Sequence, residues 1–179
     1  RIMIVHVKAA ESGMGALMKM MGMGGGKNPA ERLKETLCEK GFDAFVYESP
    51  LDQMKKQIEA GEKPSINLYF AGKNAIADFV KDMDLVITLC DVPSGRPSFG
   101  LSKGGGEIPW YVFEVPVVVV GCGQPTMLAD IPQARTYINT YDSKDTTFDA
   151  LVDALMRGED AFKGNDPIDS FCGLFDARL

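Results

Sequence analysis

The 179 residues of the chain suit one domain of ordinary size and are too few for a (β/α)₈ barrel, which needs roughly 250 residues. The formal net charge of −6 argues against a general affinity for nucleic-acid phosphates, which requires clustered lysine and arginine. No apolar run approaches the roughly 20 residues that span a bilayer. The composition therefore predicts neither a nucleic-acid nor a membrane partner.

The chain begins with a strand and a helix that are clearly marked. A near-continuous apolar run at 2–7 predicts a strand buried on both faces. A segment rich in methionine and glycine follows at 12–26. The next pattern predicts a helix that Asn28 caps and Gly41 ends, because these residue types are typical of the two helix termini. A second strand is expected at 42–47.

The same alternation continues toward the middle of the chain. A second helix is predicted at 50–60, with Ile58 on its apolar face and Gly61 as its stop. A third helix fits 74–82. The run at 85–90 predicts a third strand, again buried on both faces.

The second half of the chain begins with a long stretch that contains glycine and proline, 92–114. The most apolar strand of the chain is predicted at 115–120 and another at 136–141. A helix with a regular apolar face is expected at 146–156. The tail at 161–179 shows no clear period.

Strands that alternate with amphipathic helices indicate βαβ units and a sheet covered on both faces. The sequence therefore predicts an α/β fold, a three-layer sandwich with a mostly parallel sheet of about five or six strands, similar to flavodoxin. We expect residues 1–179 to form a single domain, because there is neither an internal repeat nor a low-complexity linker. Since the chain enters a strand directly at Arg1, we also expect it to be a piece of a longer protein.

The four cysteines are interpreted as reduced structural thiols. None forms a CxxC pair, and three of them lie in apolar runs, where cysteine behaves as a small buried hydrophobe. This usage favours a reducing compartment, and we expect a cytoplasmic location. The cysteines are Cys38, Cys90, Cys122 and Cys172.

The glycine-rich stretch at 22–28 stands between a strand and a helix, where a phosphate-binding loop would lie. A P-loop requires glycine where Met21 stands and a hydroxyl residue where Asn28 stands. The dinucleotide pattern also fails, because Lys27 replaces its third glycine. We therefore predict no phosphate site and interpret the methionines of 14–23 as an adaptable apolar contact.

Candidate catalytic groups are few and scattered. His6 is the single histidine and lies within the first strand, which favours a satisfied core residue over a nucleophilic or zinc site. Asp91 ends a strand, at the edge where open α/β sheets bind ligands. Glu107, Glu114 and Asp130 lie in or near loops, where carboxylates are usually solvated. No residue is assigned as catalytic, cofactor-binding or metal-ligating on this basis.

Several short motifs follow one another over about the last third of the chain. They are Pro116-Val117-Val118-Val119-Val120, Gln124-Pro125-Thr126, Leu128-Ala129-Asp130-Ile131-Pro132, Thr136-Tyr137-Ile138-Asn139 and Phe162-Lys163-Gly164. In this order they resemble the C-terminal domain of glycoside hydrolase family 3, in particular its β-N-acetylhexosaminidase-like members.

The resemblance implies an accessory domain. In that family most of the catalytic work belongs to a separate N-terminal barrel, and the two-histidine signature of the hexosaminidase branch cannot be present in a chain with one histidine. The parent would hydrolyse β-linked N-acetylhexosaminides or β-glucosides with retention. The partners implied are the barrel of the same polypeptide and, through the parent, a carbohydrate substrate; no cofactor or metal is implied.

Two other functions stay open at this point. One is a flavodoxin-like domain that binds a small molecule or nucleotide. The other is an interaction module that uses the methionine-rich segment 14–23. If the accessory role is correct, Arg96 and its neighbours in 92–114 are the loop residues that could reach the substrate.

Overall fold

The computed structural model describes residues 1–8, 28–48, 50–63, 80–91, 114–123, 125 and 134–164. The predicted helix at 74–82, apart from its end, and the segments 12–26 and 92–113 lie outside these ranges. The elements, in chain order, are β1 (Ile2–Lys8), α2 (Pro29–Glu39), β2 (Ala44–Val46), α3 (Pro50–Glu59), β3 (Leu85–Asp91), β4 (Val117–Gly121), β5 (Thr136–Asn139), α6 (Asp145–Arg157) and the short 3₁₀ helix η5 (Glu159–Ala161).

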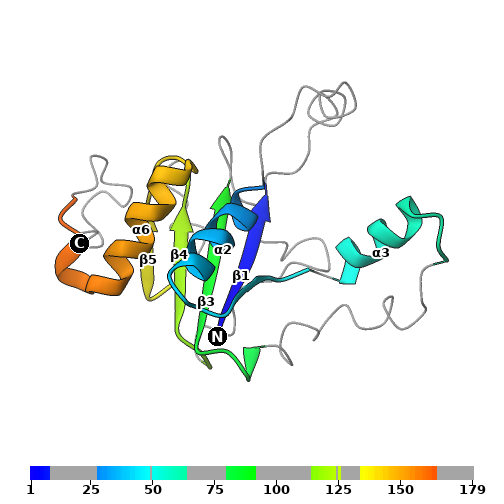
Figure 1. The fold of residues 1–179 in the computed structure, drawn as a ribbon, viewed down its shortest axis with the longest axis horizontal. Coiled ribbons are helices and arrows are strands. Elements are labelled where there is room, and N and C mark those ends of the chain that lie inside the picture. The colour runs from blue at the N-terminus through cyan, green and yellow to red at the C-terminus, as the bar shows by residue number, and fades with distance from the viewer. Residues whose placement is uncertain are drawn as a thin grey trace.

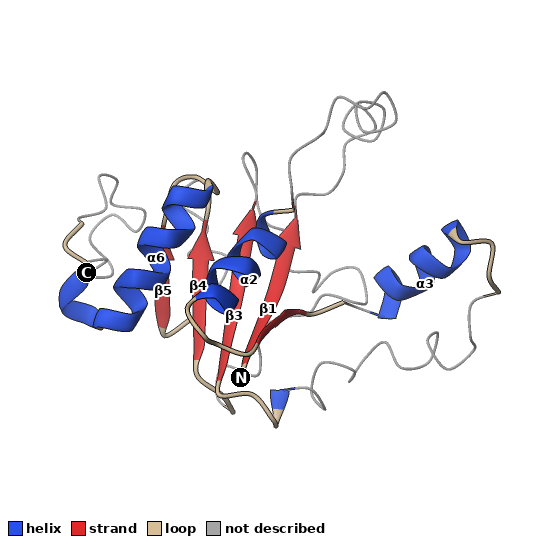
Figure 2. Ribbon diagram, in the orientation of Figure 1, coloured by secondary structure: helices blue, strands red, loops and turns tan. Residues whose placement is uncertain are grey.

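The five strands form one parallel sheet in the order β2-β1-β3-β4-β5. Figure 1 and Figure 2 show the strand arrows pointing the same way, with α2 and α6 across one face. This is the strand order of flavodoxin-like folds. The predicted three-layer α/β class with a parallel sheet is therefore confirmed.

Both faces of the sheet are buried, as the continuous apolar runs predicted. Along β1, Met3 and Val5 enter one core cluster, whereas Ile2 and Ile4 enter the other. Successive side chains of a strand point to opposite faces, so a strand that is apolar at every position can be buried on both sides. Residues of β3 and β4 divide between the two clusters in the same way.

The face that carries Ile2 and Ile4 is covered by α2 and α6. Leu33 and Leu37 of α2 are buried against it together with Phe148 and Leu151 of α6. These residues recur at helical spacing, so each helix directs one apolar stripe at the sheet. Among the described helices, none is both long and apolar enough to cross a membrane.

The predicted helix termini are found at their expected residues. The Asn28 side chain accepts a hydrogen bond from the backbone N–H of Ala30 at 3.1 Å, which caps α2. Gly41 follows α2 with a φ of 92° and Gly158 follows α6 with a φ of 87°. Both angles lie in the left-handed region, where glycine is favoured because it has no Cβ.

Four details differ from the sequence-based prediction. The second strand is only Ala44–Val46, and Phe42 lies outside it with a partly exposed ring. Ile58, expected on a buried face, is 55% exposed, because α3 stands to the side of the sheet (Figure 1). Cys38 is exposed on α2, since it follows Leu37 by one residue and so points away from the core. The last strand ends at Asn139, two residues before Tyr141.

Candidate functional site at the carboxyl edge of the sheet

The strand order reverses direction between β1 and β3. From β1 the chain moves to β2 on one side, and β3, β4 and β5 then follow one another on the other side. In open α/β sheets, ligands bind outside the carboxyl ends of the strands at such a switch point. A functional site is therefore expected at the carboxyl ends of β1 and β3.

His6 and Asp91 face each other at this point. His6 of β1 is paired in register with Leu89 of β3, so Asp91 lies two residues further along and on the same face of the sheet. The Nε2 atom of His6 is 3.9 Å from Oδ2 of Asp91. The His6 side chain is 6% exposed and that of Asp91 is 29% exposed. A buried ring thus stands directly behind a carboxylate that solvent can reach.

The prediction of a satisfied core histidine is only partly supported. The ring of His6 is indeed in the core, but within the described ranges neither Nδ1 nor Nε2 has a hydrogen-bond partner. A buried polar group without such a partner costs about 1–3 kcal/mol. Native proteins rarely retain this cost without a structural or functional reason.

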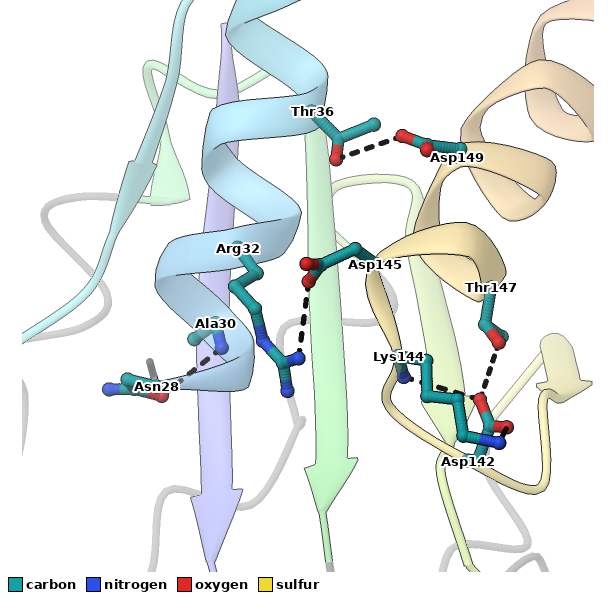
Figure 3. A network of polar contacts seen from close by, with 9 residues as sticks. All are labelled: Asn28, Ala30, Arg32, Thr36, Asp142, Lys144, Asp145, Thr147 and Asp149. Carbon is teal, nitrogen blue, oxygen red and sulfur yellow. Dashed lines mark hydrogen bonds and ion pairs between the residues drawn. The ribbon is translucent and has the colours of Figure 1, made fainter. Parts of the chain in front are cut away.

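Two helices begin at the same edge, and polar contacts hold them together. The residues involved are spaced by four along each helix, so they form a ladder between α2 and α6. The pairs are Arg32 Nη1 with Asp145 Oδ1 at 3.1 Å, Thr36 Oγ1 with Asp149 Oδ1 at 3.4 Å, and Lys40 Nζ with Asp153 Oδ1 at 2.7 Å. Figure 3 shows the first two pairs bridging the helices. The ladder fixes α6 parallel to α2.

Arg32 has a second contact besides Asp145. Its Cζ atom lies 5.9 Å from the centre of the Phe148 ring, and Phe148 is fully buried. A guanidinium at this distance is attracted to the face of the ring, and its aliphatic stem covers apolar surface. Arg32 therefore contacts α6 twice near its N-terminus, at the Asp145 carboxylate and at the Phe148 ring.

Asp142 organises the turn from β5 into α6. One of its carboxylate oxygens, Oδ1, accepts hydrogen bonds from the Thr147 hydroxyl and from the backbone N–H of Lys144 at 3.2 Å (Figure 3). The Thr147 hydroxyl, followed by Lys144, lowers the pKa of Asp142 to about 2. The charge also lies near the positive end of the helix dipole, which favours an anion. Asp142 thus ties the turn before α6 to the first turn of the helix.

The two cysteines at this edge are poor nucleophiles. Burial raises the pKa of Cys90 to about 12, with Cys122 as a further cause. Burial also raises the pKa of Cys122 to about 11, although the Thr140 hydroxyl acts in the opposite direction. Because the thiolate is the reactive form, both groups are inert at neutral pH. Among the described residues, Cys38, Cys90 and Cys122 are not joined in a disulfide.

The carboxylates singled out by the sequence are not brought together. Asp91 ends β3 at the carboxyl edge, whereas Glu114 precedes β4 at the amino edge. Glu114 lines a hollow of about 420 Å³ there, with Arg135 and Thr136 on the other side. Glu107 and Asp130 lie outside the described residues. Within the described ranges, three or more residues that could share a metal ion do not gather anywhere.

Sequence reasoning missed three features of the edge. These are the pairing of His6 with Asp91, the ladder between α2 and α6, and the role of Asp142 in the turn before α6. The first depends on the register of two strands that are far apart in the chain. The last had a local signal, because an Asp side chain often accepts a hydrogen bond from the backbone N–H two residues on.

Comparison with known proteins gives partial matches. No protein-family model matches the chain. It is 43% identical over 75 residues to the beta-N-acetylglucosaminidase/beta-glucosidase of Cellulomonas fimi, a stretch that is 42% of this chain and 13% of that enzyme. A solved structure of the beta-glucoside phosphorylase BglX matches 99% of this chain with a TM-score of 0.59 and 26% identity. A second, of BglX bound to 2FGlc, matches 97% with the same TM-score and 27% identity.

The parallel sheet and its strand order define a flavodoxin-like α/β domain. The chain spans about a quarter of each BglX chain and 13% of the curated relative. These likenesses bear out the resemblance to the C-terminal domain of glycoside hydrolase family 3 that the motifs predicted.

Proposed function

We propose that this chain is the accessory α/β domain of a family 3 glycoside hydrolase and lies C-terminal to a (β/α)₈ barrel of the same polypeptide. The parent hydrolyses β-linked N-acetylhexosaminides or β-glucosides with retention of configuration. The domain itself is not catalytic. It packs against the barrel and helps to shape the substrate cleft.

The observation that carries the proposal is the partial coverage of the relatives. Nearly the whole chain aligns with a BglX structure, yet it accounts for only 27% of that chain. A stretch of 75 residues is 43% identical to part of an enzyme whose name joins two glycosidase activities, for N-acetylglucosaminides and for glucosides. A segment of this size suits a single domain, and its small share of the relatives supports an accessory domain in a larger enzyme.

The arrangement of carboxylates also supports an accessory role. A retaining glycosidase uses two carboxyl groups that are roughly 5 Å apart. Among the described residues, Asp91 and Glu114 stand at opposite edges of the sheet, so they cannot share one glycosidic bond. This separation supports an accessory role, in which the reacting groups would lie in the barrel.

Phosphorolysis is a second candidate reaction for the parent. Both structural relatives are named phosphorylases, enzymes in which phosphate instead of water accepts the sugar. The two reactions give different products from one substrate, a free sugar or a sugar phosphate. One assay can therefore distinguish them.

The test compares the purified 179-residue chain with the full-length protein. Each is incubated with aryl β-N-acetylglucosaminide and with aryl β-glucoside, in the presence and absence of inorganic phosphate, and the sugar products are identified. We expect turnover by the full-length protein alone. A sugar 1-phosphate as the main product would assign the parent as a phosphorylase.

A control is needed to show that the short chain is folded during the assay. Its circular dichroism spectrum and a cooperative thermal transition provide this evidence. Adding the folded chain to a barrel that lacks it should then restore activity, if the domain acts by packing against the barrel. Turnover of either glycoside by the folded 179-residue chain would contradict the accessory role.

A further inference from the structure

We propose that Asp91 binds a hydroxyl group of the sugar from the carboxyl end of β3, and that His6 is the positioning residue that holds the Asp91 carboxylate. The inference rests on the proposed function and deepens it, because it names the residues that this domain would contribute to the cleft. Neither residue is assigned a catalytic role.

The position of Asp91 is the first step of the argument. It is the last residue of β3, next to the point where the strand order reverses. A carboxylate accepts hydrogen bonds from hydroxyl groups, and its four lone-pair sites can receive more than one. With 29% of its side chain exposed, Asp91 can be reached by a ligand that lies outside the sheet edge.

The burial of His6 is the second step. With 6% of its side chain exposed, the ring cannot itself meet a ligand that stays outside the sheet. Its Nε2 atom is 3.9 Å from Oδ2 of Asp91, a distance that suits an ion pair only when the ring is protonated and is too long for a hydrogen bond. A small movement of the carboxylate on binding would bring it within hydrogen-bond distance of Nε2. On this proposal His6 acts through Asp91, by holding the carboxylate once it has moved.

The rigidity of the surroundings is the third step. β1 and β3 are paired over the full length of both strands, from Ile2 with Leu85 to Lys8 with Asp91. The two side chains thus come from paired strands rather than from loops. Sites built on strands are more precise than sites on loops, which favours ligand recognition.

The first experiment measures kcat and KM of the full-length protein with an aryl β-glycoside. Asp91→Asn should lower kcat/KM by about 10- to 100-fold, as expected when a hydrogen bond to a charged group is lost. His6→Gln should lower it by about 10-fold, since a misplaced group binds less well. Asp153→Asn, a carboxylate-to-amide change in the ladder between α2 and α6, serves as the matched control and should change it by less than about twofold.

The double variant distinguishes positioning from a general loss of stability. If His6 acts only through Asp91, then adding His6→Gln to Asp91→Asn should change kcat/KM by less than about twofold. Effects that simply multiply would overturn the positioning role. An Asp91→Asn protein with unchanged kcat/KM would overturn the binding role.

The second experiment does not depend on activity. The sequence has a single histidine, so ¹⁵N-labelled 179-residue chain gives one pair of imidazole nitrogen signals. Asp91→Asn should move the Nε2 signal, whereas Asp153→Asn should leave it in place. If Asp91→Asn leaves it in place too, the pairing is wrong even in an active enzyme. If the signal moves but the full-length protein turns over neither glycoside, the pairing stands, while the proposed function and the sugar-binding role of Asp91 are both wrong.

Discussion

Gly121 is the last residue of β4, and among the described glycines it is the one at which an added Cβ atom would clash. It is buried and paired with Asn139 of β5, and Tyr137 lies two residues earlier on the same face. A Cβ atom added at Gly121 would run into the hydroxyl of Tyr137, with the Tyr137 Cζ at 3.0 Å and Asn139 Oδ1 at 3.1 Å. The tyrosine ring is stiff and packed against the core, so it cannot turn aside cheaply.

The magnitude of the Gly121→Ala effect follows from two opposing contributions. Overpacking of a buried site costs about 1–3 kcal/mol of unfolding free energy. Alanine also stiffens the unfolded chain, which stabilises by about 0.4–1 kcal/mol where the backbone is compatible. We expect a net loss of about 1–2 kcal/mol, or roughly 2–8 °C in melting temperature for a domain of this size.

Urea unfolding followed by circular dichroism measures this change, and Gly164→Ala provides the control. A Cβ at Gly164 meets nothing within 4 Å, so the same substitution there should change stability by no more than about 0.5 kcal/mol. In a Tyr137→Phe background Gly121→Ala should cost less, because the clashing oxygen is gone. If the Gly121→Ala chain is as stable as the unsubstituted chain, the packing argument is refuted.

Three further predictions concern the helices and thiols. Hydrogen bonds hold the pKa of Asp142 at about 2, below the roughly 3.9 of an unfolded chain. The contribution of Asp142 to stability is therefore complete above about pH 5 and is lost as the pH falls from about 4 to 2. The difference in melting temperature between the unsubstituted chain and Asp142→Asn should close over that range. Cys38 should react with a thiol reagent at about pH 8 long before Cys90 does, as measured by mass spectrometry of the folded chain; equal rates would contradict the burial of Cys90. In urea unfolding, Arg32→Ala should lower the free energy of unfolding by about 1–2 kcal/mol, because the arginine covers the Phe148 ring. Asp145→Ala should lower it by about 0.5 kcal/mol or less, because it removes only the ion pair. The reverse order would make the ion pair the important contact.

Much of the fold could be predicted because its signals are local. The apolar runs at β1, β3 and β4 are long enough to identify buried parallel strands, and α2 and α6 have both an apolar stripe and residues typical of helix ends. The weakest predictions concern short elements. β2 has three residues, so its neighbours Phe42 and Tyr47 looked equally suited to a strand.

The site could not be predicted in the same way, because it depends on pairing between distant segments. Nothing in the neighbourhood of His6 indicates that Asp91 will stand beside it, since the contact follows from the register of β1 with β3. Likewise, the exposure of Ile58 depends on where α3 stands relative to the sheet, which its own apolar stripe does not determine. Periodicity predicts which face is apolar, but only the tertiary arrangement decides what covers it.

The two edges of the sheet present different groups, and this limits how a barrel can use the domain. At the amino edge the Arg1 guanidinium pairs with Asp43 at 3.2 Å, so opposite charges are matched locally in exposed positions. At the carboxyl edge Asp91 faces a buried ring near the N-termini of α2 and α6, whose dipoles favour negative charge. A carboxylate in that position can accept hydrogen bonds from a ligand. We therefore expect the carboxyl edge to face the substrate cleft of the parent, with the amino edge turned away from it.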